Sequence, residues 1–276
     1  MDPRLRSFLR THGLHVRGSL AGGHQSRVYR AALEGRDVVV KVVDARSSAP
    51  VTVRRQAGLA RDLGAIDPRV VAPLPIGDEL VSVVGHHLVT VLPLVKGRVP
   101  DLDDPEDAQW LGQQLGRLHA SLRQVWSDLP PVASLRIGEH DFLDGDVQII
   151  HGDPGVANFL RDGDDAHVLD LGEAGLGTPG YDVALALFSR RFDVWSRAPG
   201  ARTPTDNAPD ALVAGYEDAV GHPLKPSELA DGERVRREAL AWWIEHPDQA
   251  PVGIRSATPA WREHLARFVR DDRLRS

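Results

Sequence analysis

The chain has 276 residues, of which 42% are hydrophobic and 26% charged, a composition typical of a globular protein with one large or two modest domains. A formal net charge of −6, with no zinc-finger, RRM or helix-turn-helix pattern, argues against a nucleic-acid partner. There is no cysteine, and the apolar runs are too short to cross a bilayer, so we expect no disulfides, no membrane partner and a cytoplasmic location.

The first residues predict a helix followed by β-hairpins. Apolar side chains at helical spacing indicate an amphipathic helix over residues 3–12. Turn-forming residues then predict a hairpin over 18–30 and a second turn at 35–37, and an apolar run predicts a strand over 38–43. We therefore expect a β-rich N-terminal region.

The tip of the first hairpin is rich in glycine and small polar residues. Glycine lets backbone N–H groups approach a phosphate closely, and hydroxyl or amide side chains add donors. Gly23, Gln25 and Ser26 are therefore candidate phosphate contacts. Glycine pairs are also common in ordinary hairpins, which is the alternative interpretation.

Lys41 is the only cation inside the run VVVKVV. Because side chains alternate along a strand, it shares a face with Val39 and Val43. A lysine on an apolar strand needs an anionic partner, unless it serves at a sheet edge to discourage aggregation.

A helix over 51–63 and further strands follow. Strand-forming residues cover 70–77 and 80–84, broken by prolines, and residues 87–94 predict a longer strand before a connector at 93–100. His86 and His87 are adjacent, so on a strand they would point to opposite sides, which argues against a metal pair.

The remaining sequence is mainly helical in pattern. The acidic run 101–107 suits the start of a helix, because carboxylates stabilise the positive end of the helix dipole, and residues 108–126 carry a leucine stripe. His119 lies on this helix and is interpreted as structural. Loops are predicted at 130–146 and 198–209. Further helices are predicted at 183–191, 211–220, 232–246 and 261–270.

The most informative segment is residues 147–184, in which acids occur at fixed offsets around two apolar strands. His151, Gly152 and Asp153 are followed four residues later by Ala157 and then Asn158, which gives H-G-D-x-x-x-x-N. Asp170-Leu171-Gly172 comes next, and the segment ends in Tyr181-Asp182-Val183-Ala184. Carboxylate and amide oxygens suit Mg²⁺, and a carboxylate beside a hydroxyl suits phosphoryl transfer. A purely turn-capping role for these residues is the alternative.

This segment resembles the catalytic centre of the aminoglycoside phosphotransferase family. The resemblance implies an α+β, two-lobed, protein-kinase-like fold with a small antiparallel β lobe (residues 1–92) that binds nucleotide. The mainly helical lobe (93–276) would carry the catalytic loop and the substrate site. The loop between Asp153 and Asn158 departs from the family, since Pro154-Gly155-Val156-Ala157 stands where a bulky residue and His-Pro-Gly are usual.

The resemblance also implies roles for individual residues. Asp153 would align and deprotonate the acceptor hydroxyl, Lys41 would orient the nucleotide phosphates, and Asn158 and Asp170 would hold Mg²⁺. The cofactor would be ATP, with GTP possible, and the backbone at Thr90 to Leu92 would bind the base. Asp182 would brace the catalytic loop.

The helix after Lys41 departs from the family pattern as well, because Gln56 stands where a glutamate usually pairs with the lysine. Either another acid serves, such as Asp62, or the protein binds nucleotide with reduced turnover. A scaffold protein with a chance motif is a further alternative.

The acceptor is expected to be a hydroxyl-bearing small molecule, namely an aminoglycoside, another antibiotic or a metabolite such as a sugar or amino alcohol, acted on by a monomer or homodimer. Candidate acceptor contacts in the C-terminal helices are Asp193, Glu217, Glu238, Glu245 and the pair Trp242-Trp243.

Overall fold

The computed structural model describes residues 1–20, 26–46, 50–125, 128–137, 146–197, 206–255 and 257–273. The chain contains two compact units, Met1–Lys96 (unit 1) and Gly97–Ser276 (unit 2). The proposed assignment of nucleotide binding to 1–92 and substrate binding to 93–276 stays a prediction.

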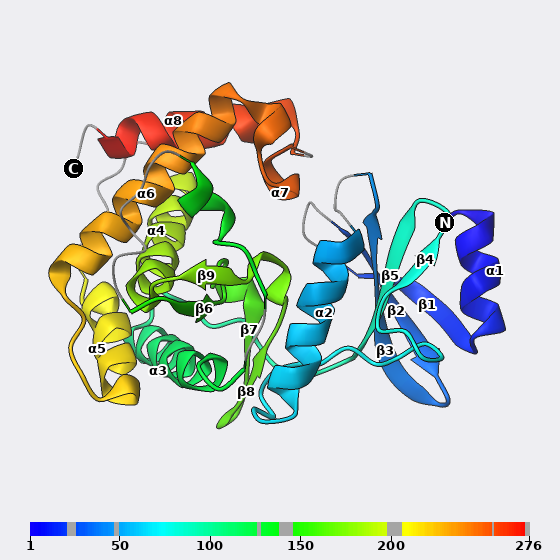
Figure 1. Ribbon diagram of the computed structural model, residues 1–276. Coiled ribbons are helices and arrows are strands. Elements are labelled where there is room, and N and C mark those ends of the chain that lie inside the picture. The colour runs from blue at the N-terminus through cyan, green and yellow to red at the C-terminus, as the bar shows by residue number, and fades with distance from the viewer. Residues whose placement is uncertain are drawn as a thin grey trace. The chain divides into compact units, whose positions relative to one another are not determined.

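Unit 1 is an antiparallel sheet with a helix on each face (Figure 1). Its strands pair in the order β1-β2-β3-β5-β4. The elements are α1 (Pro3–Thr11), β1 (Leu14–Leu20), β2 (Ser26–Leu33), β3 (Arg36–Asp44), α2 (Pro50–Gly64), β4 (Ser82–Val84) and β5 (His87–Pro93).

Side chains alternate along β3, so successive residues of this strand lie on opposite faces of the sheet. Val38, Val40 and Val42 are buried against Leu5 and Leu9 of α1. The intervening residues, Lys41 among them, point to the other face, as the period of two predicts. One end of that second face is covered by α2, whose Ala57 packs with Leu88 of β5.

Unit 2 is mainly helical and also contains short strands. Its helices are α3 (Pro105–Leu122), α4 (Pro179–Arg197), α5 (Ala208–Val220), α6 (Pro226–Glu245), α7 (Val252–Arg255) and α8 (Pro259–Arg273). Its strands are β6 (Gln148–Ile150), β7 (Phe159–Asp162), β8 (Asp165–Val168) and β9 (Gly175–Gly177). Short 3-10 helices are η1 (Ala133–Arg136), η3 (Val156–Asn158), η4 (Leu171–Glu173) and η5 (Pro247–Gln249).

Helices α3 and α5 pack unusually closely because glycines face the contact. A Cβ on Gly112 would lie 2.0 Å from the Leu212 carbonyl oxygen, and one on Gly215 would lie 2.1 Å from that of Gln109. The predicted leucine stripe of α3 is fully buried. This pair forms one side of the core against which β6 packs.

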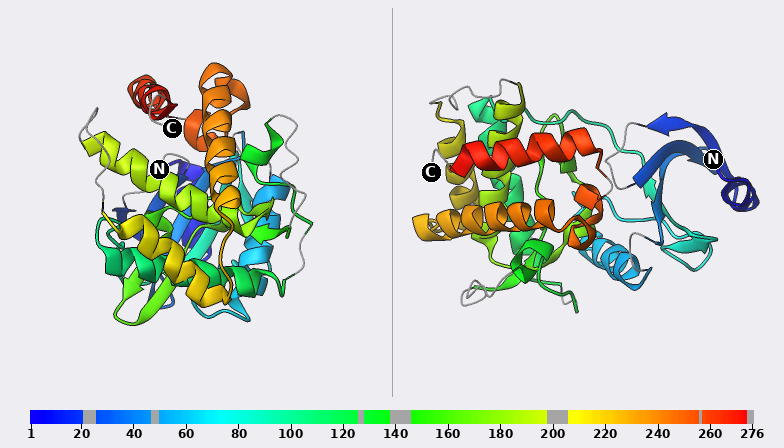
Figure 2. Two further views of the ribbon diagram at one scale, coloured as in Figure 1. Left: turned by 90° about the vertical axis from the view of Figure 1, so that its left-hand side faces the viewer. Right: turned by 90° about the horizontal axis from the view of Figure 1, so that it is seen from above.

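The C-terminal helices form a second core. Figure 2 shows α6 and α8 running side by side, and Leu240 and Trp243 of α6 pack there with Leu265 and Phe268 of α8. In the described part of the chain, no helix is both long and apolar enough to cross a membrane.

The structure corrects several predicted boundaries. Helices α3, α4, α6 and α8 begin at prolines, ahead of the predicted starts, because proline is favoured in the first turn, where its missing N–H is not needed. The second turn is at Glu34-Gly35, with φ of 50° and 80°, so Arg36 and Asp37 already belong to β3. Residues 70–77 form isolated bridges instead of a strand, since the prolines there lack donors.

Candidate active site

The β7–β8 hairpin positions two of the predicted metal ligands. Phe159 pairs with Val168, so Asn158 and Asp170 flank the open end of the hairpin. The Leu169 N–H donates to the Asn158 carbonyl, 2.8 Å away, which extends the ladder by one bond. Asp170 is exposed and has a left-handed backbone with φ of 52°. The hairpin therefore fixes where both residues leave the sheet.

Asp153 and Asn158 are in direct contact. The Asn158 amide nitrogen donates to the Asp153 main-chain oxygen at 2.8 Å and lies 3.4 Å from the carboxylate Oδ2. The bond uses the nitrogen of the amide, so the amide oxygen takes no part in this contact. The sequence-predicted general base and metal ligand are thus brought together.

His151 joins the Asp153 segment to the Asp170 segment. It is fully buried; its Nε2 donates to the Leu169 carbonyl at 3.1 Å, and its Nδ1 accepts from the Asp153 N–H at 3.3 Å. Both nitrogens are used inside the protein, so His151 orients the loop.

Asp182, at the start of α4, accepts hydrogen bonds from main-chain N–H groups of the loop that carries Asp153, and so braces this loop as predicted. Its Oδ2 accepts from the His151 N–H at 2.7 Å, and its Oδ1 accepts from the Gly152 N–H at 2.9 Å. His119 of α3 donates to the same carboxylate from Nε2 at 3.0 Å, and its Nδ1 lies 2.9 Å from the Tyr216 hydroxyl. Burial, with the charge of Asp182 adding, raises the pKa of Tyr216. His119 is structural, as expected.

Gly152 is required by close packing. Its φ is 78°, and a Cβ there would lie 2.2 Å from the Glu173 carbonyl oxygen. Any other residue would push the loop that carries Asp153 away from η4.

Glu173 is a site residue that the sequence analysis missed. Burial of its carboxyl group, with the negative charge of Asp153 adding, raises the pKa of Glu173 to about 7. Asp170 acts in the same direction, whereas Arg236 and Arg136 oppose the shift. A strongly shifted carboxyl beside candidate catalytic groups is a mark of functional sites. The available signal was an acid directly after the Asp-x-Gly triplet.

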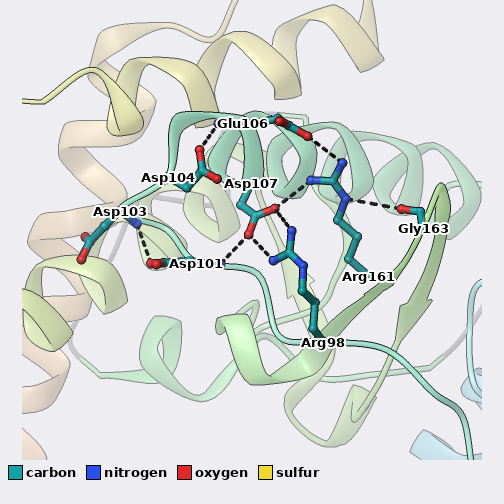
Figure 3. A network of polar contacts seen from close by, with 8 residues as sticks. All are labelled: Arg98, Asp101, Asp103, Asp104, Glu106, Asp107, Arg161 and Gly163. Carbon is teal, nitrogen blue, oxygen red and sulfur yellow. Dashed lines mark hydrogen bonds and ion pairs between the residues drawn. The ribbon is translucent and has the colours of Figure 1, made fainter.

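A buried ion-pair network anchors the hairpin from the other side (Figure 3). Asp107, at 1% exposure, accepts from Arg98 at 2.7 Å, from Arg161 of β7 at 2.7 Å and from the Asp101 N–H at 2.8 Å. Arg98 and Arg161 also exchange two main-chain hydrogen bonds. Asp104, in contrast, caps α3 by accepting from the Glu106 N–H at 3.0 Å, as expected of an acid at a helix start.

In unit 1, the predicted nucleotide contacts share one face of the sheet. Lys41 pairs with Thr90, Val39 with Leu92, and Ser26 with Val43, so Ser26, Lys41, Thr90 and Leu92 all point to the face opposite α1. Gly23 and Gln25 lie outside the described residues.

The main-chain groups of Thr90 to Leu92 in β5 are used in pairing with neighbouring segments. The Val91 carbonyl accepts from the Leu74 N–H, so the alternating carbonyls of Thr90 and Leu92 point toward β3. The main-chain base contact expected at Thr90 and Leu92 therefore does not fit, and these residues offer their side chains instead.

The two residues considered as partners of Lys41, Gln56 and Asp62, lie on different sides of α2. Gln56 is partly buried and lies on the same side of α2 as the buried Leu59 and Leu63, one and two turns further on. Asp62 is exposed and accepts from Arg61 at 2.8 Å. Asp62 is therefore on the wrong side of the helix to replace a glutamate at position 56.

The candidate acceptor contacts are dispersed. Trp243 is a core residue at 1% exposure, whereas Trp242 is exposed and stacks on His246, so the two tryptophans do not act as a pair. Glu217 accepts from the Leu224 N–H at 2.9 Å and Glu238 is paired with Arg234, which are structural roles. Glu245 and Asp193 are both exposed.

An antiparallel unit with a strand lysine and a helical unit with an H-G-D-x-x-x-x-N and D-x-G loop define a protein-kinase-like fold. The model of the Phosphotransferase enzyme family matches residues 18–139 and 121–226. The chain belongs to this family of phosphotransferases.

Solved structures agree with this assignment. The chain is similar to the amicoumacin kinase hAmiN in complex with AMP-PNP, Ca²⁺ and Ami (TM-score 0.69, 14% identity, 98% of this chain and 93% of that chain). It is also similar to a microcompartment-associated aminopropanol kinase (TM-score 0.66, 16% identity, 97% and 95%). A third similar structure is a spectinomycin phosphotransferase with ADP and spectinomycin (TM-score 0.60, 12% identity, 97% and 94%). No curated protein sequence matches the chain.

Proposed function

We propose that the protein is an ATP-dependent phosphotransferase that moves the γ-phosphoryl group to a hydroxyl of a small molecule, an aminoglycoside or another antibiotic. The observation that carries this is the contact of Asp153 with Asn158 at the open end of the hairpin that leads into Asp170. We further propose that it acts in the cytoplasm as a monomer or homodimer, with no nucleic-acid or membrane partner.

Asp153 is the proposed base. As the acceptor oxygen forms its bond to the γ-phosphorus, the bond from that phosphorus to the bridging oxygen of ADP breaks, and the acceptor proton passes to the Asp153 carboxylate. The loop geometry supports this role, because Asp182 and His151 fix the backbone around Asp153 and leave its carboxylate partly exposed.

Asn158 and Asp170 fit a magnesium ion by donor type. One offers an amide oxygen and the other an exposed carboxylate, and the neighbouring imidazole of His151 is already used on both nitrogens. Bound there, magnesium would neutralise charge on the nucleotide phosphates.

Lys41 is proposed to orient the nucleotide phosphates from the sheet of unit 1. Ser26, Thr90 and Leu92 share its face, so their side chains are the proposed further contacts of the nucleotide, along with Gly23 and Gln25. ATP is the proposed donor, and GTP would be accommodated by the same phosphate contacts.

A metabolite kinase is the second candidate, favoured by the similarity to an aminopropanol kinase. A nucleotide-binding protein with little turnover is the third, favoured by Gln56 in place of the usual acid.

Release of ADP from purified protein with ATP and Mg²⁺ tests the proposal against a panel of aminoglycosides, other antibiotics, sugars and amino alcohols. One class of acceptor should stimulate ADP release, and Asp153→Asn should lower that rate by at least about 100-fold. Asp162→Asn, an exposed change at the tip of the same hairpin, is the control. Nucleotide binding without any acceptor-stimulated release would favour the third candidate, and an unchanged rate in Asp153→Asn would refute the assigned base.

A further inference from the structure

Three side chains with metal-binding atoms meet in unit 1, on residues to which the phosphotransferase proposal gives no role. Asp2, His86 and His87 each offer one ligand atom, and these atoms all lie within 4.8 Å of one another. Asp2 is the N-cap of α1, His86 lies in the turn between β4 and β5, and His87 is the first residue of β5. The expectation that the two histidines point apart is wrong, because His86 is in the turn and not on a strand, and the ring centroids are 4.0 Å apart.

The two oxygens of Asp2 have different surroundings. Oδ1 caps α1 by accepting from the Arg4 N–H at 2.7 Å, whereas Oδ2 faces Nε2 of His87 at 3.8 Å. That separation is too long for a hydrogen bond. It is close to the roughly 3.3 Å between neighbouring ligand atoms around a tetrahedral zinc ion with bonds of about 2.0 Å.

His87 presents its Nε2 to this gap. The residue is 2% exposed, and Nε2 faces Oδ2 of Asp2, whereas Nδ1 is buried and meets no hydrogen-bond partner in the described part of the chain. Nε2 is therefore the nitrogen that can reach a ligand.

We propose that Asp2, His86 and His87 bind a zinc ion, with water as the fourth ligand. Two imidazoles and one carboxylate suit zinc, whereas magnesium prefers oxygen ligands alone. His87 alternates with Leu88 along β5 and lies on the α1 side of the sheet, opposite the face of Lys41 and Thr90. The ion would therefore fasten α1 to the β4–β5 turn without touching the proposed nucleotide contacts.

Two variants remove ligands while keeping the fold. Asp2→Asn keeps the helix cap, because asparagine caps as well as aspartate does, but removes the carboxylate. His86→Ala changes an exposed side chain. His222→Ala, an exposed histidine of unit 2, is the matched control, and Asp170→Asn tests whether zinc enters the proposed magnesium site instead.

The experiment is calorimetric titration of the full-length, untagged protein with zinc chloride in excess Mg²⁺, together with thermal unfolding with and without zinc. We expect one zinc ion per chain, a rise in the unfolding temperature, and at least a 10-fold loss of affinity in Asp2→Asn and in His86→Ala. His222→Ala and Asp170→Asn should bind as the wild type does. Absence of binding, or equal binding by wild type, Asp2→Asn and His86→Ala, would overturn the proposal, and neither outcome bears on phosphoryl transfer.

Discussion

Replacing Asp107 with asparagine tests whether the buried network of Figure 3 holds the catalytic hairpin. The change keeps the shape of the side chain but removes the charge that Arg98, Arg161 and the Asp101 N–H share. Removing one partner of a buried ion pair costs about 3–5 kcal/mol. Here Arg98 is 55% and Arg161 is 20% exposed, so both cations regain water in the variant, and we expect a loss of about 2–3 kcal/mol.

Thermal unfolding provides the assay. For a chain of this size the expected loss corresponds to a fall in Tm on the order of 5–10 °C. The matched control is Glu106→Gln, because Glu106 also pairs with Arg161 but is 74% exposed, so its loss should cost no more than about 0.5 kcal/mol. Equal Tm values for the two variants would refute the reasoning.

The pH dependence gives an independent check of the same prediction. The hydrogen bond from Arg98 holds the pKa of Asp107 well below its usual range. A carboxyl group whose pKa is lowered by folding stabilises the folded protein at pH values above its ordinary pKa of about 4. This stability is lost as the pH falls from about 4 toward the lowered pKa. The difference in Tm between wild type and Asp107→Asn should therefore shrink below about pH 4, and a constant difference would contradict the assignment.

Two further predictions concern the loop and its buried acid. Gly152→Ala should lower Tm and reduce the rate of phosphoryl transfer by at least about 100-fold, because the added Cβ would meet the Glu173 carbonyl oxygen. The control is Gly163→Ala, which is also at positive φ but in open space, and which should keep the rate. Similar rates for the two variants would contradict the packing argument. The pKa of Glu173 is raised to about 7, so above the ordinary carboxyl pKa its ionisation destabilises the folded protein. The free energy of unfolding of Glu173→Gln in EDTA, measured by urea unfolding, should therefore rise by about 2–3 kcal/mol relative to wild type between pH 5 and pH 8. A difference that does not change with pH would exclude the raised pKa.

The sequence predicted those features that depend on local spacing. The alternation of β3 placed Lys41 correctly, since a strand has only two faces. The helix after the acidic run was expected because carboxylates stabilise the positive end of a helix dipole, although Pro105 marks its start more closely than the first apolar residue does. Proline at the first helical position is the signal that would have corrected the other helix starts.

Features that depend on distant partners were not predicted. Asp107 was assigned to the helix dipole because nothing in its neighbourhood shows that Arg161, 54 residues away, contacts it. The raised pKa of Glu173 comes first from burial and then from the charge of Asp153, with Arg236 opposing, and these groups surround it only through tertiary packing. The histidine pair was misjudged for a local reason, since the strand was taken to include a residue of the turn.

The way Asp182 binds the catalytic loop bears on which substitutions the loop can accept. Both of its oxygens contact main-chain N–H groups of His151 and Gly152, so the grip does not depend on the side chains that follow. Pro154-Gly155-Val156-Ala157 takes no part in that contact. Sequence change in this segment therefore leaves the two main-chain hydrogen bonds to Asp182 in place, so the loop stays anchored on the N-terminal side of Asp153.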